Sequence, residues 1–130
     1  CGRLGASIAQ RVAERGGEVT ILDYDRQSFA THLPKDFKGR MVTGMEIDTD
    51  VLRRAGIEEA RSVVIVSRDE STNMMVADVA RHVFGIENII VRIDQPQLHD
   101  LYKSLGFDVL SPIAEATELL ERRLAVLGDA

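Results

Sequence analysis

The sequence predicts an α/β fold of the Rossmann type, a doubly wound parallel sheet with helices on both faces. Two observations lead to this prediction. Short apolar runs rich in Val and Ile alternate with longer segments whose apolar residues recur every three or four positions. The short runs are continuously apolar, which is typical of parallel strands that are buried on both faces.

Five strands are expected along the chain. The clearest are the run EVTILD at residues 18–23, the run SVVIVS at residues 62–67 and the run NIIVRI at residues 88–93. Two shorter strands are expected at residues 39–43 and 108–110. Because helical segments separate the strands, the connections should be right-handed crossovers of a parallel sheet.

Four helices are expected between and after these strands. The first opens at Gly5 and the second near Ser71, and each has one apolar face. These faces consist of Ile8, Ala9, Val12 and Ala13 in the first helix and of Met75, Val79, Ala80 and Val83 in the second. A third helix covers residues 97–105 behind Pro96, and Pro112 opens a last helix that is rich in leucine.

Length and composition restrict the classes of function. A chain of 130 residues fits one domain, and 45% hydrophobic residues suffice for its core. The net charge of -5 argues against a nucleic-acid-binding surface, and no apolar run approaches the ~20 residues of a membrane span. One cysteine cannot form an internal disulfide. We therefore expect a single cytoplasmic domain over residues 1–130 that neither binds nucleic acid nor inserts into a membrane.

The chain opens with Cys1-Gly2-Arg3-Leu4-Gly5 and continues directly into the first helix. This segment is interpreted as the tail of a G-x-G-x-x-G motif. In that motif one glycine lets the backbone approach a pyrophosphate and the last lets the helix pack closely on a strand. The start of the helix then offers free N–H groups to the phosphates. Two glycines alone more often mark a turn, so the context has to support the interpretation.

Asp23 supplies that context. It follows Gly5 by eighteen residues and ends the next expected strand, where a dinucleotide-binding fold places the carboxylate that binds the adenosine ribose. A turn residue or a helix cap is the alternative interpretation. An acid here repels a 2′-phosphate, which favours NAD(H) or an adenine nucleotide over NADP. Arg26 would have the opposite effect, but we expect it to begin the following helix.

The expected fold has one more strand than the chain supplies. That strand would precede the glycine-rich segment and lie between strands 18–23 and 62–67 in the centre of the sheet. Without it the sheet would have a gap in its middle. We therefore expect residues 1–130 to be an N-terminally truncated form of the folded domain.

Four longer motifs accompany the glycines and Asp23. They are T-G-x-x-x-D-x-D-V-L-x-x-A-G-I-E-x-A at residues 43–60, S-x-D-E-S-T-N-M at residues 67–74, V-R-I-D-Q-P at residues 91–96 and Y-K-S-L-G-F-D-V-L-S-P at residues 102–112. Together they resemble the potassium-transport nucleotide-binding domain (KTN, or RCK N-terminal, domain) of Trk-type potassium-uptake regulatory subunits. The resemblance covers essentially the whole chain.

The resemblance implies a cytoplasmic regulatory domain that binds NAD(H) or an adenine nucleotide such as ATP, ADP or AMP. It also implies a homodimer or a ring-forming homo-oligomer, at the inner face of the membrane, that gates a membrane potassium-translocating subunit. The family's C-terminal effector domain lies outside these 130 residues.

Site residues are carried over from the family by position. Gly2, Arg3, Leu4 and Gly5 form the phosphate loop, Asp23 the ribose site, and Met45 and Glu46 the adenine site. Ser67 ends the strand at residues 62–67, Asn73 belongs to the helix start beyond it, and Arg92 lies near the nucleotide on the strand at residues 88–93. Many members have Gly-Asp where this chain has Gly44-Met45, so the adenine contact is expected to be apolar or made by the backbone.

Several of these residues also have structural interpretations. Arg3 would then be a solvated first-turn residue and Asn73 a helix cap. A charge such as Arg92 on a buried strand needs a partner, which Asp94 or Asp69 would provide. The three histidines have no metal-ligand spacing, so we expect no metal site.

Two other classes of function are alternatives to this interpretation. In the first, the chain is the cofactor-binding half of an NAD-dependent oxidoreductase. No Tyr-x-x-x-Lys motif supports this, because Gly106 follows Tyr102 at that spacing and Ser28 follows Tyr24. In the second, the chain is an assembly module with a vestigial site, which the retained glycines and Asp23 argue against. We therefore expect a nucleotide sensor and not an enzyme.

Overall fold

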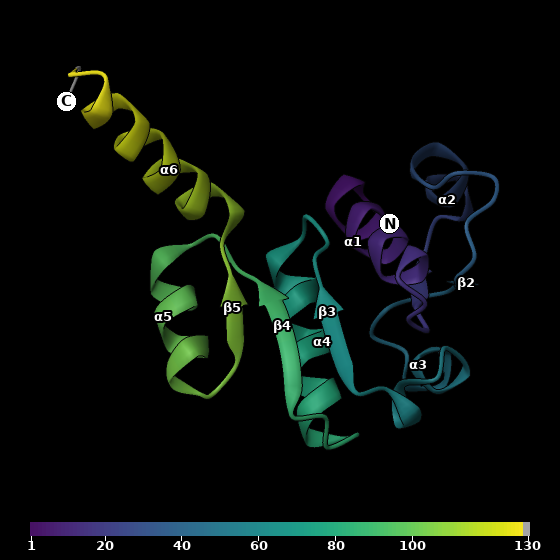
Figure 1. The fold of residues 1–130 in the computed structure, drawn as a ribbon. Coiled ribbons are helices and arrows are strands. Elements are labelled where there is room, and N and C mark those ends of the chain that lie inside the picture. The colour runs from purple at the N-terminus through teal and green to yellow at the C-terminus, as the bar shows by residue number, and fades with distance from the viewer. Residues whose placement is uncertain (129–130) are drawn as a thin grey trace.

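Parallel strands alternate with helices throughout the computed structural model, which describes residues 1–128 (Figure 1). The strands are β1 (Thr20–Asp23), β2 (Arg40–Thr43), β3 (Ser62–Ile65), β4 (Asn88–Arg92) and β5 (Asp108–Leu110). The helices are α1 (Arg3–Glu14), α2 (Arg26–His32), α3 (Thr49–Arg54), the 3₁₀ turn η1 (Ile57–Glu59), α4 (Glu70–His82), α5 (Pro96–Ser104) and α6 (Pro112–Val126). All five expected strands and all four expected helices are present, and α2 begins at Arg26 as predicted.

The strands form two parallel sheets. β1 pairs with β2, and β4 lies between β3 and β5. Within residues 1–128 no ladder joins β1 to β3. The pairs β1–β2, β3–β4 and β4–β5 are all parallel, so within each sheet the carboxyl ends of the strands point toward the same edge.

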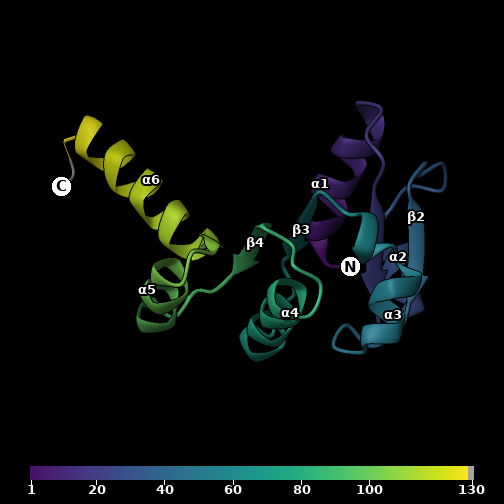
Figure 2. The same ribbon diagram turned by 90° about the horizontal axis from the view of Figure 1, so that it is seen from below.

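Helices cover both faces, and each face has its own core. In β1, Ile21 packs in the core that α1 and α2 cover, whereas the next residue, Leu22, packs against the core on the other side. This alternation is that of a strand buried on both faces. The view in Figure 2 shows α1 and α4 on opposite sides of β3.

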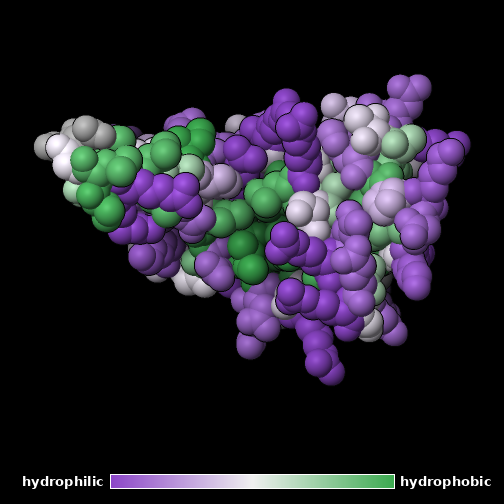
Figure 3. All heavy atoms as spheres, turned by 45° about the horizontal axis from the view of Figure 1, so that its top comes forward, coloured by the Kyte–Doolittle hydropathy of each residue, from purple (hydrophilic) through white to green (hydrophobic). Residues whose placement is uncertain are grey.

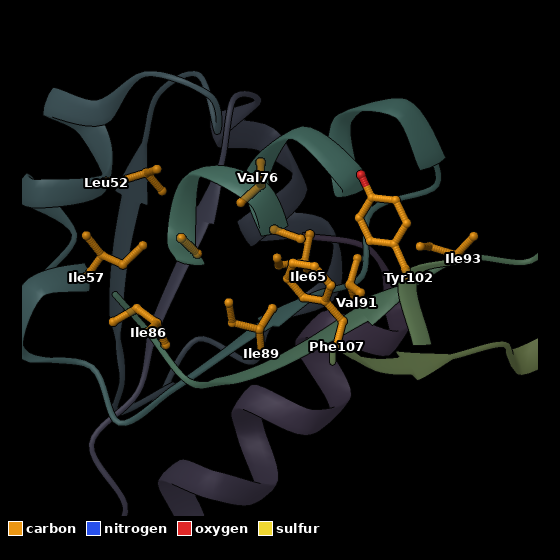
Figure 4. Packing of buried hydrophobic residues seen from close by; sticks show 12 residues of the cluster. Leu52, Ile57, Ile65, Val76, Ile86, Ile89, Val91, Ile93, Tyr102 and Phe107 are labelled. Atoms are coloured by element: carbon orange, nitrogen blue, oxygen red, sulfur yellow. The ribbon is translucent and has the colours of Figure 1, made fainter. Parts of the chain in front are cut away.

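The larger core joins the two sheets through the helices. Leu52 of α3 and Ile57 of η1 belong to the same cluster as Val76 of α4 and the central residues Ile89 and Val91 of β4 (Figure 4). The second sheet is therefore tied to the first by side-chain packing in the helix layer.

The predicted apolar faces of two helices were right only in part, since Ala9 in α1 and Ala80 in α4 are buried as expected and Val79 packs against the core. In α4 the buried residues are Asn73, Val76, Ala77 and Ala80, whereas Met75 and Val83 are 52% and 55% exposed. In α1 the buried residues are Ala6 and Ala9, and Ile8 is 42% exposed. The buried face of each helix therefore differs from the predicted face. Small residues, and in α4 also a polar residue, face the sheet where larger apolar side chains were expected.

The last helix, α6, extends away from the domain (Figure 1). None of its residues is buried, and Leu119, Leu120, Leu124 and Leu127 are 40–72% exposed. Figure 3 shows hydrophobic surface along this helix and beside it in the middle of the molecule. None of the described helices is long and apolar enough to cross a membrane.

The free edges of β1 and β3 give a first prediction, that a strand lies between them in the folded protein. A buried backbone N–H or C=O group without a hydrogen-bond partner costs ~1–3 kcal/mol of stability, and this strand would supply partners for several such groups. We expect a six-residue Val- and Ile-rich segment ending in glycine, added ahead of Cys1, to raise the free energy of unfolding by several kcal/mol. The control carries six Gly and Ser residues instead. Equal stability of the two proteins in urea would contradict the predicted topology.

Candidate functional site

The sequence-predicted residues gather at the carboxyl ends of the strands. Asp23 and Arg92 are the last residues of β1 and β4, Met45 and Glu46 follow β2, and Ser67 follows β3 by two positions. In an open parallel sheet this edge is where ligands bind, at the point where the strand order reverses. In the predicted topology that point lies between β1 and β3.

The start of α1 is free to bind an anion. Gly2 is its N-cap in an extended conformation, and no side chain caps the helix. By contrast, Asp25, Asp48 and Asp69 cap α2, α3 and α4 and accept hydrogen bonds from backbone N–H groups at 2.9–3.0 Å. The first-turn N–H groups of α1 and its positive dipole end therefore remain available for a phosphate.

The two glycines of the loop have different surroundings. A Cβ on Gly5 would lie 3.4 Å from Cγ2 of Val66, so Gly5 lets α1 pack closely on the end of β3. A Cβ on Gly2 would meet no atom within 4 Å. The space in front of Gly2 is open, as a close ligand requires, and Arg3 and Leu4 are exposed on the same first turn.

Asp23 lies directly beside this loop. Its Oδ2 contacts the nitrogen of Cys1, and its Oδ1 accepts a hydrogen bond of 2.9 Å from the N–H of Asp25. The side chain is 13% exposed. Oδ1 of Asp23 therefore makes the turn contact that was the alternative interpretation of this residue. Asp23 is not a helix cap, because Asp25 caps α2. Each carboxylate oxygen has two lone pairs, so both can still accept a ribose hydroxyl.

Negative charge surrounds the same loop. The carboxylates of Glu46 and Asp25 both act electrostatically on the nitrogen of Cys1 at the start of the loop. Both carboxylates are therefore close to the loop. Met45, beside Glu46, is 55% exposed and presents an apolar surface at this end of β2.

Asn73 connects the ends of two strands. It is completely buried in α4, where its Nδ2 donates to the carbonyls of Ser67 at 2.8 Å and Arg92 at 3.1 Å. Its Oδ1 accepts a hydrogen bond of 2.5 Å from Oγ of Ser67. Asp69, and not Asn73, caps the helix. Asn73 therefore positions Ser67 and Arg92, and both hydrogens of its amide are already in use.

Arg92 forms the ion pair that the sequence left as an alternative. Its Nε lies 3.2 Å from Oδ2 of Asp94, and the Arg92 side chain is 23% exposed. Glu70, at the start of α4, accepts hydrogen bonds from the N–H groups of Asp94 and Gln95. Sequence reasoning missed Glu70, because only the fold brings residues 24 positions apart together. Within residues 1–128 no group of three metal-ligating side chains is placed to hold a metal ion.

The family model described as TrkA-N domain matches residues 1–112 of the chain. A Trk system potassium uptake protein TrkA from Streptomyces coelicolor is 39% identical over 128 residues, which is 98% of this chain and 57% of the relative. The TrkA protein of Azorhizobium caulinodans is 32% identical over 137 residues and is covered to 29%. The chain thus spans little more than half of the first relative and less than a third of the second.

Two solved structures share the fold. The first is the NAD(P)-binding domain of an exopolyphosphatase-related protein from Archaeoglobus fulgidus, with a TM-score of 0.76, 17% identity and coverage of 95% of this chain and 92% of that one. The second is the Kef CTD of Shewanella denitrificans in an AMP-bound form, with a TM-score of 0.74, 19% identity and coverage of 99% and 79%. These likenesses confirm the predicted Rossmann-like class.

The position of Asp23 gives a second prediction. Asp23→Ala should weaken the binding of ADP at least tenfold, because charge-assisted hydrogen bonds to ribose contribute ~1.5–3 kcal/mol each. Isothermal titration calorimetry measures the change. Asp36→Ala is the control, since Asp36 lies in the segment before β2, away from the strand ends. If Asp23→Ala binds ADP as tightly as the control, Asp23 is not part of the site.

Proposed function

Because the chain belongs to the TrkA-N domain family, we propose that it is a nucleotide-binding regulatory domain of a potassium transport system. The observation that carries this proposal is the uncapped start of α1 at Gly2, directly beside Asp23 at the carboxyl edge of the strands. A phosphate acceptor next to a carboxylate that can bind a diol is the combination that an adenosine phosphate requires.

We infer that the ligand is NAD(H) or an adenine nucleotide without a 2′-phosphate. Its phosphates would bind the N–H groups of Arg3, Leu4 and Gly5, and its ribose would bind Asp23. The base would lie toward Met45 and Glu46. Three carboxylates near the loop, those of Asp23, Asp25 and Glu46, support the exclusion of NADP-type ligands by repulsion.

We infer the partner and the place of action from the names of the relatives. The similar proteins from Streptomyces and Azorhizobium are named Trk system potassium uptake proteins, and a 25% identical relative from Methanocaldococcus jannaschii is named potassium channel protein 1. The proposed partner is accordingly a membrane potassium-translocating subunit, at whose cytoplasmic side the domain acts by binding and not by catalysis.

The proposed mechanism is a shift of populations. Two forms of the ligand favour different arrangements of the subunits, and their difference in affinity biases the coupled pore. A ligand that bound both arrangements equally would have no effect.

Nucleotide binding gives a third prediction. At 100 times its dissociation constant, the ligand should stabilise the protein by ~2.7 kcal/mol, because it binds only the folded state. Thermal unfolding is measured with NAD, NADH, ATP, ADP and AMP, and with NADP as the disfavoured control. The proposal fails if none of the five raises the midpoint of unfolding.

The exposed leucines of α6 give a fourth prediction, that the protein forms a homodimer or a larger homo-oligomer through this helix. Apolar patches of this kind mark interaction surfaces. Leu120→Glu combined with Leu124→Glu should give monomers in sedimentation velocity. Arg122→Glu, on the opposite side of the helix, is the control and should leave assembly unchanged. A native protein that sediments as a monomer at all concentrations would contradict the prediction.

A further inference from the structure

The direction of α6 is fixed at its first turn. No residue of α6 is buried, so no core contact along the helix determines where it points. Pro112 has no N–H group, and the side chain of the N-cap residue Ser111 does not cap the helix. Ser111 itself is only 4% exposed and anchors the start of the helix in the domain.

Asp94 holds this first turn. Its Oδ1 accepts hydrogen bonds from Oγ of Ser111 at 3.2 Å and from the N–H of Ile113 at 3.5 Å. The Asp94 carboxylate, two residues beyond the end of β4, therefore caps α6 in place of the Ser111 side chain. Its negative charge also interacts favourably with the positive end of the helix dipole.

The same carboxylate holds Arg92. The other oxygen of Asp94, Oδ2, pairs with Nε of Arg92 at 3.2 Å, and the backbone N–H of Asp94 donates to Glu70. Arg92 is the last residue of β4, at the carboxyl edge of the sheet, and its side chain is 23% exposed to solvent. One side chain thus contacts both a proposed ligand-binding residue and the base of α6.

We propose that Asp94 is a positioning residue that couples occupancy of the nucleotide site to the direction of α6. This inference rests on the proposed function. A phosphate that draws the Arg92 guanidinium toward itself competes with Oδ2 of Asp94. The carboxylate then loses its charged partner, and its hold on Ser111 and Ile113 changes.

The coupling must act in both directions, because linkage between two sites is reciprocal. The Arg92–Asp94 pair holds the arginine away from the ligand, so removal of the Asp94 charge should tighten the binding of a phosphate. A partly exposed ion pair is worth up to ~1 kcal/mol, which corresponds to about a fivefold change in affinity. Adenosine, which has no phosphate, should show no such change.

The test uses the full chain with ADP and adenosine as probes. Asp94→Asn removes the charge but keeps an oxygen that can accept from Ser111 and Ile113. Asp100→Asn is the matched control, because Asp100 is an 85% exposed carboxylate on α5. Calorimetry gives the dissociation constants, and hydrogen–deuterium exchange of residues 112–118 reports on the first turn of α6.

We expect Asp94→Asn to bind ADP about three- to fivefold more tightly, with the affinity for adenosine unchanged. In the native protein and in Asp100→Asn, ADP should alter exchange in residues 112–118, and this response should disappear in Asp94→Asn. The inference is overturned by an unchanged affinity for ADP, by an equal gain for adenosine, or by an α6 response that is absent from the native protein or persists in Asp94→Asn. If the native protein binds no nucleotide at all, the proposed function itself fails.

Discussion

The buried amide of Asn73 holds the carboxyl ends of β3 and β4 at a fixed separation, and the geometry of the ligand edge depends on it. Ser67 lies beyond the end of β3, where the ladder no longer supplies hydrogen-bond partners. Asn73 donates to its carbonyl and to that of Arg92, and it accepts from the Ser67 hydroxyl. Without these bonds, each buried polar group left unpaired would cost ~1–3 kcal/mol of stability. The ends of β3 and β4 would then be free to separate. Ser67 and Arg92 are thus positioned by a residue that itself faces the interior.

Helix packing is a second constraint, which holds the strand ends of the two sheets together. No ladder connects β1 to β3 among the described residues, yet Leu52 of α3 shares a core with α4 and β4. On the other face, the contact of α1 with the end of β3 at Gly5 sets how close the glycine loop comes. Helix packing on both faces therefore fixes the phosphate loop relative to the strand ends.

The sequence predicted the parts of this arrangement that follow from local patterns. The strands were predicted because their apolar runs are continuous, and α1 and α4 because their apolar residues recur with a helical period. Most of the buried face of α4 was not predicted, because it consists of the polar residue Asn73 and small apolar residues rather than large apolar ones. The short helices α2 and α3 have too few turns for a periodic signal, although Asp25 and Asp48 cap them. Only the start of α2 at Arg26 was predicted, and α3 was not predicted at all. The bonds of Asp94 to Ser111 and of Glu70 to Asp94 join residues 17 and 24 positions apart, which no local pattern shows.

The contrast between α4 and α6 shows why the coupled element should be the last helix. Turning α4 would expose its face of Asn73, Val76, Ala77 and Ala80, at a cost that binding one small ligand does not easily supply. Turning α6 exposes no residue of the domain's own core, because none of the residues of α6 is buried there. Coupling free energies between sites are typically 1–3 kcal/mol. That range is enough to redirect a helix held by one carboxylate, and too little to repack a core. If ligand binding changes the direction of α6, the polar contacts that hold the start of this helix must lie at the same edge as the ligand. Asp94, which makes these contacts, lies at that edge.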